Sequence, residues 1–293
     1  MKTLIGVGCS HTQGCASILG VGTEHKEYKL ASEPLKLKYG LANKSVRTDK
    51  VSTEWITENF SWIGELGNLL KVDKKLNFGS GGAGIDHCIR ILRNYAFRKK
   101  DLFNHLIIFQ VPSFDRREVF WKNGLKWTLE TLGNLLSQLN FGLRGDAHLK
   151  KNSERIKIFY EFFHNEDFYV VKYMYELYFI QDYLEKFGAK VFLFGNFSPE
   201  VLNIQNNLNY YDDIIEMFQK YQNINNWSSD VTKMISMKEL YNNINFINPI
   251  FEKNKYTLDS EGLVRDDNHL SGYGNKRLAN LIYGLIKNEK LFK

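Results

Sequence analysis

Short apolar runs along the chain predict the buried strands of a sheet. Such runs occupy residues 3–8, 106–111 and 190–195, and residues 75–78 and 244–247 are shorter strand candidates. A brief unbroken apolar run is typical of a strand that is covered on both faces. The pattern therefore predicts several buried strands that are spread over the whole chain.

Apolar residues at helical spacing fill the stretches between these runs. They predict helices over residues 55–70, 85–98, 168–187, 231–240 and 277–287. Strands that alternate with helices indicate an α/β fold, in which helices cover both faces of a parallel sheet. No internal repeat is visible, so we expect one domain over residues 1–293.

Two stretches lack this alternation. Residues 22–54 are polar without clear periodicity, which predicts a long loop or insertion. Residues 116–165 mix aromatic, basic and polar side chains, and we expect a helical insertion there. Loops on a rigid scaffold commonly decide what a protein binds, so we expect these insertions to control substrate choice.

Composition narrows the functional classes. The 39 basic and 33 acidic residues leave a net charge of only +6, with no basic arm or module that would indicate a nucleic-acid partner. Three irregularly spaced cysteines, Cys9, Cys15 and Cys88, fit neither a disulfide framework nor a zinc site. No apolar run reaches the roughly 18 residues of a membrane span, and the one before Cys9 is too short for a signal peptide. We expect a cytoplasmic or otherwise soluble protein without a metal.

The first candidate for chemistry directly follows the first predicted strand. Gly8-Cys9-Ser10 places a serine at the carboxyl edge of a parallel sheet, where open α/β sheets bind ligands. A helix that starts after this turn would offer backbone N–H groups to an oxyanion. Ser10 also suits the N-cap of such a helix, so this segment alone leaves both roles open.

The second candidate lies just before the last predicted helix, at Asp266-Asp267-Asn268-His269. A serine hydroxyl is a weak nucleophile until a base takes its proton, and histidine is the usual base near neutral pH. An aspartate three residues earlier in a loop can orient the imidazole. A polar loop that caps the helix explains the same residues, so this segment alone is also ambiguous.

Together, the two segments resemble the SGNH hydrolases, also called the GDSL-type esterase/lipase superfamily. That family has a G-D-S block on its first strand, matched by Gly8-Cys9-Ser10, and a D-x-x-H block before its last helix, matched by residues 266–269. Its second block, a glycine-bearing turn after an asparagine, is matched by residues 77–82. The resemblance is anchored at both ends of the chain and in its first third.

The resemblance implies a three-layer α/β/α sandwich of flavodoxin-like type and a serine ester hydrolase. Ser10 would be the nucleophile, His269 the base and Asp266 the residue that orients it. The backbone N–H groups of Ser10 and Gly82 would bind the oxyanion. The expected substrate is a small-molecule or carbohydrate ester that reacts through an acyl-enzyme, and no cofactor is implied.

Two positions depart from the family pattern. Cys9 stands where the family has an aspartate, which is not the nucleophile, so we expect a structural consequence only. The third block, G-x-N-D, lacks its asparagine: the predicted strand that contains Gln110 is followed by residues 111–116, where Ser113 is the nearest positional candidate. Arg116 or Gln110 could donate instead. Losing one oxyanion donor typically lowers kcat by about 10²–10³-fold, so a non-catalytic binding module stays an alternative. Acyl transfer by the same triad is a further alternative, because the sequence does not separate it from hydrolysis.

Other assignments are less well supported. Residues 79–84 fit the G-x-G-x-x-G pattern of dinucleotide sites, but no acidic residue follows at the required distance. Cys9 or Cys15 as nucleophile is chemically reasonable, although a small buried structural cysteine is more usual. Thr12 stands where the α/β-hydrolase motif G-x-S-x-G requires its last glycine.

Overall fold

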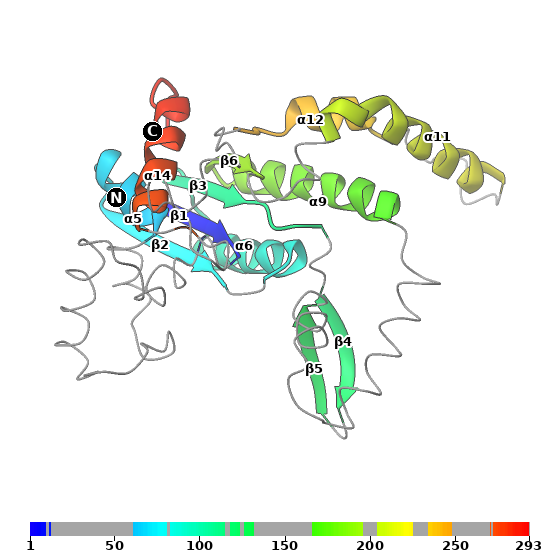
Figure 1. Cartoon of the computed structure of the whole chain (residues 1–293), viewed down its shortest axis with the longest axis horizontal. Coiled ribbons are helices and arrows are strands. Elements are labelled where there is room, and N and C mark those ends of the chain that lie inside the picture. The colour runs from blue at the N-terminus through cyan, green and yellow to red at the C-terminus, as the bar shows by residue number, and fades with distance from the viewer. Residues whose placement is uncertain are drawn as a thin grey trace, which may run out of the picture.

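The computed structural model describes residues 1–9, 12, 61–80, 83–114, 118–123, 126–131, 166–195, 204–224, 234–247, 270 and 272–292. Its centre is a four-stranded parallel sheet in the order β2-β1-β3-β6 (Figure 1). The strands are β1 (Thr3–Gly8), β2 (Lys74–Gly79), β3 (His105–Gln110) and β6 (Lys190–Phe194). The predicted parallel sheet is confirmed.

The strand order creates a switch point between β1 and β3. The chain passes from β1 to β2 on one side and then crosses to β3 on the other. Beyond β6, a parallel bridge joins Leu193 to Phe246, so the predicted strand at 244–247 is a single bridge. This is the flavodoxin-like order, in which ligands bind outside the carboxyl ends of the strands at the switch point.

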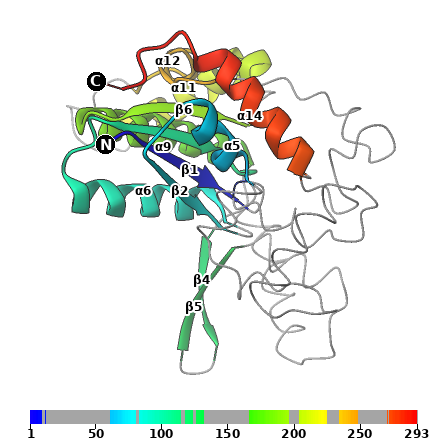
Figure 2. The ribbon, with the colours of Figure 1, turned by 90° about the vertical axis from the view of Figure 1, so that its left-hand side faces the viewer.

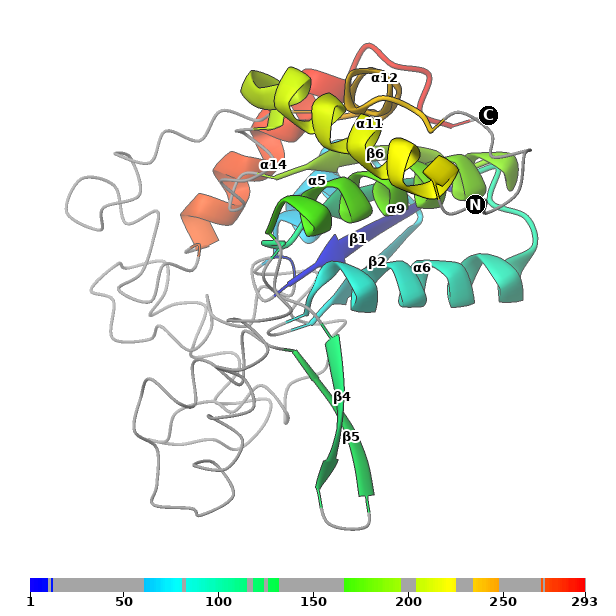
Figure 3. The ribbon, with the colours of Figure 1, turned by 90° about the vertical axis from the view of Figure 1, so that its right-hand side faces the viewer.

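Helices cover both faces of the sheet. On one face lie α6 (Ile85–Lys99), α9 (Glu166–Lys186), α11 (Leu208–Ile224) and α12 (Met237–Asn243), and on the other lie α5 (Trp62–Leu69) and α14 (Gly272–Ile286) (Figures 2 and 3). A short 3-10 helix, η2 (Gln205–Asn207), precedes α11. The fold is therefore a three-layer α/β/α sandwich, as predicted.

Alternation along the strands divides the core into two clusters. In β3, Ile107 and Phe109 pack under α6 and α9, whereas Leu106 and Ile108 pack under α5 and α14. All four side chains are almost fully buried. Because side chains alternate along a strand, Gln110 continues the row on the α5/α14 face.

Local signals explain where the helices begin. α5 starts at Trp62 because the Ser61 hydroxyl accepts a hydrogen bond from Gly64 N at 3.2 Å. Ser236 caps α12 in the same way and has Glu239 three residues later, so this helix begins at Met237 and not at the predicted residue 231. The helix α11 was not predicted, and α14 begins five residues earlier than the prediction.

The helical insertion predicted over residues 116–165 is wrong for its first part. Strands β4 (Glu118–Asn123) and β5 (Lys126–Thr131) form a separate antiparallel pair. Both strands are rich in aromatic and β-branched residues, and the sequence between them contains Gly124, a residue type typical of hairpin connections. The remainder of this prediction and the insertion at 22–54 lie outside the described residues.

Both ends of the chain lie at the amino edge of the sheet (Figure 2). The Lys2 ammonium lies 5.7 Å from the centre of the Phe292 ring, and Lys190 at the start of β6 forms an ion pair with Glu289 at 3.4 Å. The end of α14 is therefore at the amino edge and its start points to the carboxyl edge. No helix within the described ranges is both long and apolar enough to cross a membrane.

Candidate active site at the carboxyl edge of the sheet

The predicted site residues divide into two groups. Ser113 is described, and so are the strand ends Gly8, Gly79 and Gln110 that frame the switch point. The other predicted residues lie outside the described part of the chain: Ser10, Gly82, Arg116, Asp266 and His269. Their described neighbours show how the surrounding chain is held.

Gly8 lets two segments approach each other closely. A Cβ atom at this position would lie 2.8 Å from the carbonyl oxygen of Gln110 and would overlap the Thr12 hydroxyl. Such distances are not tolerated between non-bonded atoms. Glycine is therefore required here if Thr12 and Gln110 are to meet across the end of β1.

Thr12 is held by two neighbouring strands. Its hydroxyl donates to Gln110 Oε1 from β3, and its carbonyl oxygen accepts from Asn77 Nδ2 of β2 at 2.9 Å. The exposed fractions of Thr12 and Gln110 are 0% and 1%, so water does not compete for these groups. Gly8 and Thr12, two residues before and two residues after Ser10, are thus held in place.

The turn after β2 joins the same network. The Oδ1 atom of Asn77 accepts from Gly79 N at 2.8 Å, and Ser80 N donates to the Gly8 carbonyl oxygen at 3.1 Å. Ala83 N in turn donates to the Ser80 carbonyl oxygen at 3.0 Å. Asn77 therefore ties the glycine-rich turn to Thr12. The motif pattern in the sequence pointed to this block but not to the role of Asn77, for which a polar residue near the end of a strand was the available signal.

The segment after β3 is anchored at both ends. Val111 N donates to the Phe194 carbonyl oxygen at 2.8 Å, and the buried Phe114 ring packs against Tyr173 with 5.4 Å between ring centres. Ser113 is partly buried between these anchors. Its role as an oxyanion donor stays a prediction.

The chain next to His269 is anchored on the α5/α14 face. Leu270 is 2% exposed and belongs to the core cluster that includes Trp62. Asn275 accepts a hydrogen bond from Trp62 N at 3.2 Å and donates to the Leu270 carbonyl oxygen at 3.4 Å. The starts of α5 and α14 are thus joined at the carboxyl edge, on the face toward which Gln110 points.

Charged groups form a second cluster on the opposite face. Lys172 lies 3.3 Å from Asp86 and 2.9 Å from Glu176, and Tyr173 donates to Asp86 at 3.1 Å. Burial raises the pKa of Glu176. Nowhere in the described ranges do three or more His, Cys, Asp or Glu side chains come together as a metal site would require.

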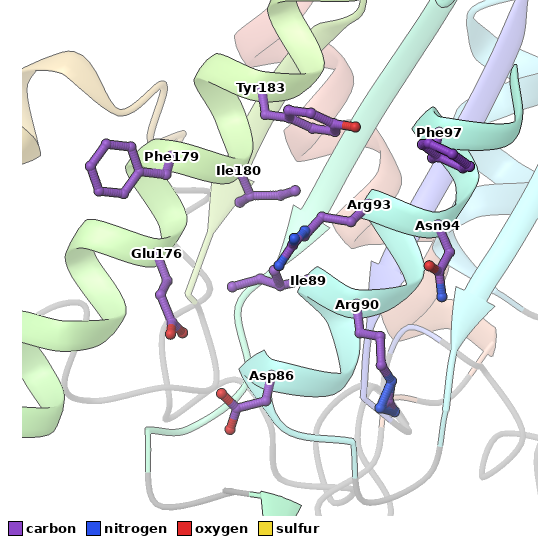
Figure 4. Close-up of a pocket in the computed structure, with 10 residues that line it drawn as sticks. All are labelled: Asp86, Ile89, Arg90, Arg93, Asn94, Phe97, Glu176, Phe179, Ile180 and Tyr183. Carbon is purple, nitrogen blue, oxygen red and sulfur yellow. The ribbon is translucent and has the colours of Figure 1, made fainter. Parts of the chain in front are cut away.

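A surface groove of about 880 Å³ lies between α6 and α9 (Figure 4). Ile89 and Ile180 line it together with Arg93, and the exposed rings of Phe97 and Phe179 flank it. Among the described residues that line it there is no serine, cysteine or histidine. Ser113, the predicted site residue that the structure describes, does not line it.

His105 begins β3 at the amino edge, and burial lowers its pKa. A base for Ser10 must lie within hydrogen-bond reach of it. A residue at the opposite end of the strands does not meet that requirement. The other described histidine, His87, lies in the first turn of α6, and its Nδ1 is 2.9 Å from Arg90 Nη2.

No protein-family model matches the chain, and no curated protein matches it in sequence. Among solved structures, it is similar to a member of the lipolytic protein G-D-S-L family from Veillonella parvula (9% identity, 99% of this chain and 100% of that one, TM-score 0.43). It is also similar to the psychrotrophic esterase EstA from a Pseudoalteromonas species (13%, 98% and 98%, 0.42). A catalytic mutant of the acetylxylan esterase Axe2 from Geobacillus stearothermophilus is a third (10%, 100% and 96%, 0.40). These TM-scores lie below 0.5, so the likenesses decide neither family nor activity for this chain.

Proposed function

We propose that this chain is a serine ester hydrolase with Ser10 as nucleophile, His269 as base and Asp266 as the residue that orients His269. One observation carries the proposal. Thr12, which follows Ser10 by two residues, and Leu270, which follows His269 directly, are both anchored at the carboxyl edge on the α5/α14 face. The described residues beside the two motifs thus lie at the same edge of the sheet and on the same face, which supports a shared site.

The position of Thr12 also supports a ligand site. It lies at the switch point between β1 and β3, where open α/β sheets of this order bind their ligands. Gly8 and Asn77 both lie against Thr12, and neither has a nucleophilic side chain. Ser10, which stands between Gly8 and Thr12 in the chain, would lie at the opening of the crevice.

In the first half of the reaction, Ser10 Oγ forms a bond to the ester carbonyl carbon while its proton moves to His269. The electron pair of the carbonyl double bond moves to the oxygen, where the N–H groups of Ser10 and Gly82 stabilise it. The intermediate then collapses, the bond to the alcohol oxygen breaks, and His269 returns the proton to the leaving alcohol. An acyl group remains on Ser10.

In the second half, water attacks the acyl carbon while His269 takes a proton from it. Collapse breaks the bond to Ser10 Oγ, which regains its proton, and releases the carboxylic acid. If a sugar hydroxyl takes the place of water, the same steps transfer the acyl group. We propose small-molecule or carbohydrate esters as the substrate class.

Turnover of p-nitrophenyl acetate and butyrate by the purified protein tests the proposal. We expect Ser10→Ala to lower kcat by about 10³-fold or more, because the acyl-enzyme loses its attachment point. Ser236→Ala is the matched control, since this serine caps α12 away from the site and its loss should leave kcat unchanged. A fluorophosphonate probe should label the wild type and not Ser10→Ala.

Three outcomes separate the alternatives. Equal turnover in wild type and Ser10→Ala rules out Ser10 as nucleophile. The absence of both turnover and labelling indicates the binding module that the missing third-block asparagine suggests. Turnover that rises when an alcohol acceptor is added, with transfer products detected by mass spectrometry, identifies acyl transfer.

A further inference from the structure

The side-chain nitrogen of Gln110 is a buried donor without an acceptor. Gln110 is 1% exposed, and Nε2 forms no hydrogen bond to any described residue. Leaving a buried donor unpaired costs about 1–3 kcal/mol. Native proteins rarely keep such a group unless a ligand, a water or a catalytic step uses it.

The orientation of the amide follows from Thr12. The Thr12 hydroxyl needs an acceptor for its proton, and Gln110 Oε1 is in close contact with it. The Val7 carbonyl oxygen, the other acceptor on offer, lies at 3.5 Å, which is too long for a good hydrogen bond. Oε1 therefore faces Thr12, and Nε2 is the atom left over.

Asn77 provides an internal comparison. It holds Thr12 from the other neighbouring strand, and both of its polar atoms are used, one by Thr12 and the other by Gly79. The contacts with Thr12 and Gly79 thus account for the whole Asn77 amide. The contact with Thr12 accounts for only the oxygen of Gln110.

Resting on the proposed function, we propose that Gln110 Nε2 is the third oxyanion donor, in place of the missing asparagine of the third block. Its side chain starts beside Gly8, two residues before Ser10, and contacts Thr12, two residues after it. When Ser10 attacks, the carbonyl electron pair moves to oxygen, and the Nε2–H group donates to that oxyanion. A donor fixed in a site without water stabilises this charge far more than one in solution.

Gln110→Met tests the donor, because it keeps the approximate size of the side chain and removes its polar atoms. We expect kcat to fall by about 10²–10³-fold, with KM changed by less than about threefold. Thr12→Val removes the contact but leaves the Nε2 donor in place, so its loss in kcat should be smaller. Gln110→Glu keeps the acceptor for Thr12 without the donor, and should match Gln110→Met.

Gln181 on α9 is the matched control. It is 4% exposed, and both amide atoms are satisfied, by the Asn243 carbonyl oxygen at 3.0 Å and Asn245 N at 2.8 Å. Gln181→Met should lower the melting temperature and leave kcat unchanged. The double variant Thr12→Val/Gln110→Met removes both partners of one buried contact, so it should melt at or above the wild-type temperature while its kcat stays low.

The result that overturns the inference is Gln110→Met with kcat within about threefold of wild type, since a lost oxyanion donor costs far more. Ser10-dependent turnover would then survive, and only the donor role would fall. A double variant that melts well below wild type with unchanged kcat would make Gln110 a purely structural residue. Wild type without Ser10-dependent turnover or probe labelling would instead remove the hydrolase itself.

Discussion

At the carboxyl edge of the sheet, Thr12, Asn77 and Gln110 have exposed fractions of 0%, 9% and 1% and form hydrogen bonds to the chain between the strands. At the amino edge, the hydrogen bonds between described side chains are exposed or, as between Tyr95 and His105, only partly buried. Lys75 Nζ, for example, donates to Asn68 at 2.6 Å on the surface. The same strands therefore end in two different kinds of polar contact.

The difference indicates where function resides. Burying polar groups is costly unless each of them is satisfied, whereas exposed pairs exchange readily with water and contribute little. Exposed hydrogen bonds at both edges would be enough to close the loops. Buried hydrogen bonds at one edge fix the geometry of the segments around them, as a site for chemistry requires.

The largest expected difference in stability is between substitutions of two asparagines, one at each edge of the sheet. Asn77→Ala removes the partner of the buried Thr12 carbonyl oxygen and of the partly buried Gly79 N. This should cost about 2–4 kcal/mol of unfolding free energy and most of the proposed ester turnover. Asn68→Ala, at the exposed edge, should change the free energy by less than about 0.5 kcal/mol. Urea unfolding and the ester assay measure both. Equal effects would abolish the distinction between the edges.

Two glycines give the next contrast. Gly8→Ala forces a Cβ against the rigid Gln110 backbone and should cost about 1–3 kcal/mol. At Gly67 in α5, the new Cβ would approach the Lys75 side chain at 2.9 Å, and this flexible chain can move away. Gly67→Ala should therefore stabilise the protein by up to about 1 kcal/mol through helix propensity. Thermal unfolding of both variants measures these changes in stability. A loss of stability in Gly67→Ala similar to that in Gly8→Ala would contradict the predicted contrast.

The third prediction concerns pH. Burial lowers the pKa of His105 at the amino edge, so the unfolded chain takes up a proton near its ordinary pKa of about 6.5 before the folded chain does. The free energy of unfolding should thus fall as the pH is lowered through that value. His105→Gln should flatten this dependence in urea titrations from pH 8 to 5. The pH profile of ester turnover, which we propose His269 sets, should stay the same in the variant; a shifted profile would link the two edges.

The smallest effect is expected for Glu289→Gln, which breaks the ion pair with Lys190. The two side chains are 51% and 36% exposed, so water screens the pair. The loss in unfolding free energy should be below about 1 kcal/mol and should vanish in high salt. Turnover should not change. A loss well above this value would show that exposed contacts at the amino edge are more important than their exposure indicates.

The sheet was predictable because its signal is local. The apolar runs in β1, β3 and β6 identify buried strands without knowledge of their partners, and the glycine-rich turn after β2 marks a strand end. The hairpin β4–β5 had a signal of its own, two aromatic-rich runs around Gly124, which the surrounding polar residues obscured. The helix α11 lies in a stretch for which the sequence yielded no prediction.

The site was only partly predictable, for a physical reason. Motif spacing points to Ser10, Asp266 and His269 because their chemistry restricts residue type. The residues that hold the neighbouring chain, such as Thr12 and Gln110, act through a contact between positions 98 apart, and nothing local in the sequence indicates which side chains will meet. Their roles emerge only when the sheet order brings β1 and β3 together.

The hydrogen bond between Trp62 N and Asn275 has a consequence for biosynthesis. It joins positions 213 residues apart, and α14 supplies one wall of the core cluster around Trp62 and Leu4. While the chain is being made on the ribosome, that cluster stays open to water until α14 has emerged. The growing polypeptide therefore exposes one apolar face of its sheet until α14 has been synthesised, and chaperones would have reason to bind it during this interval.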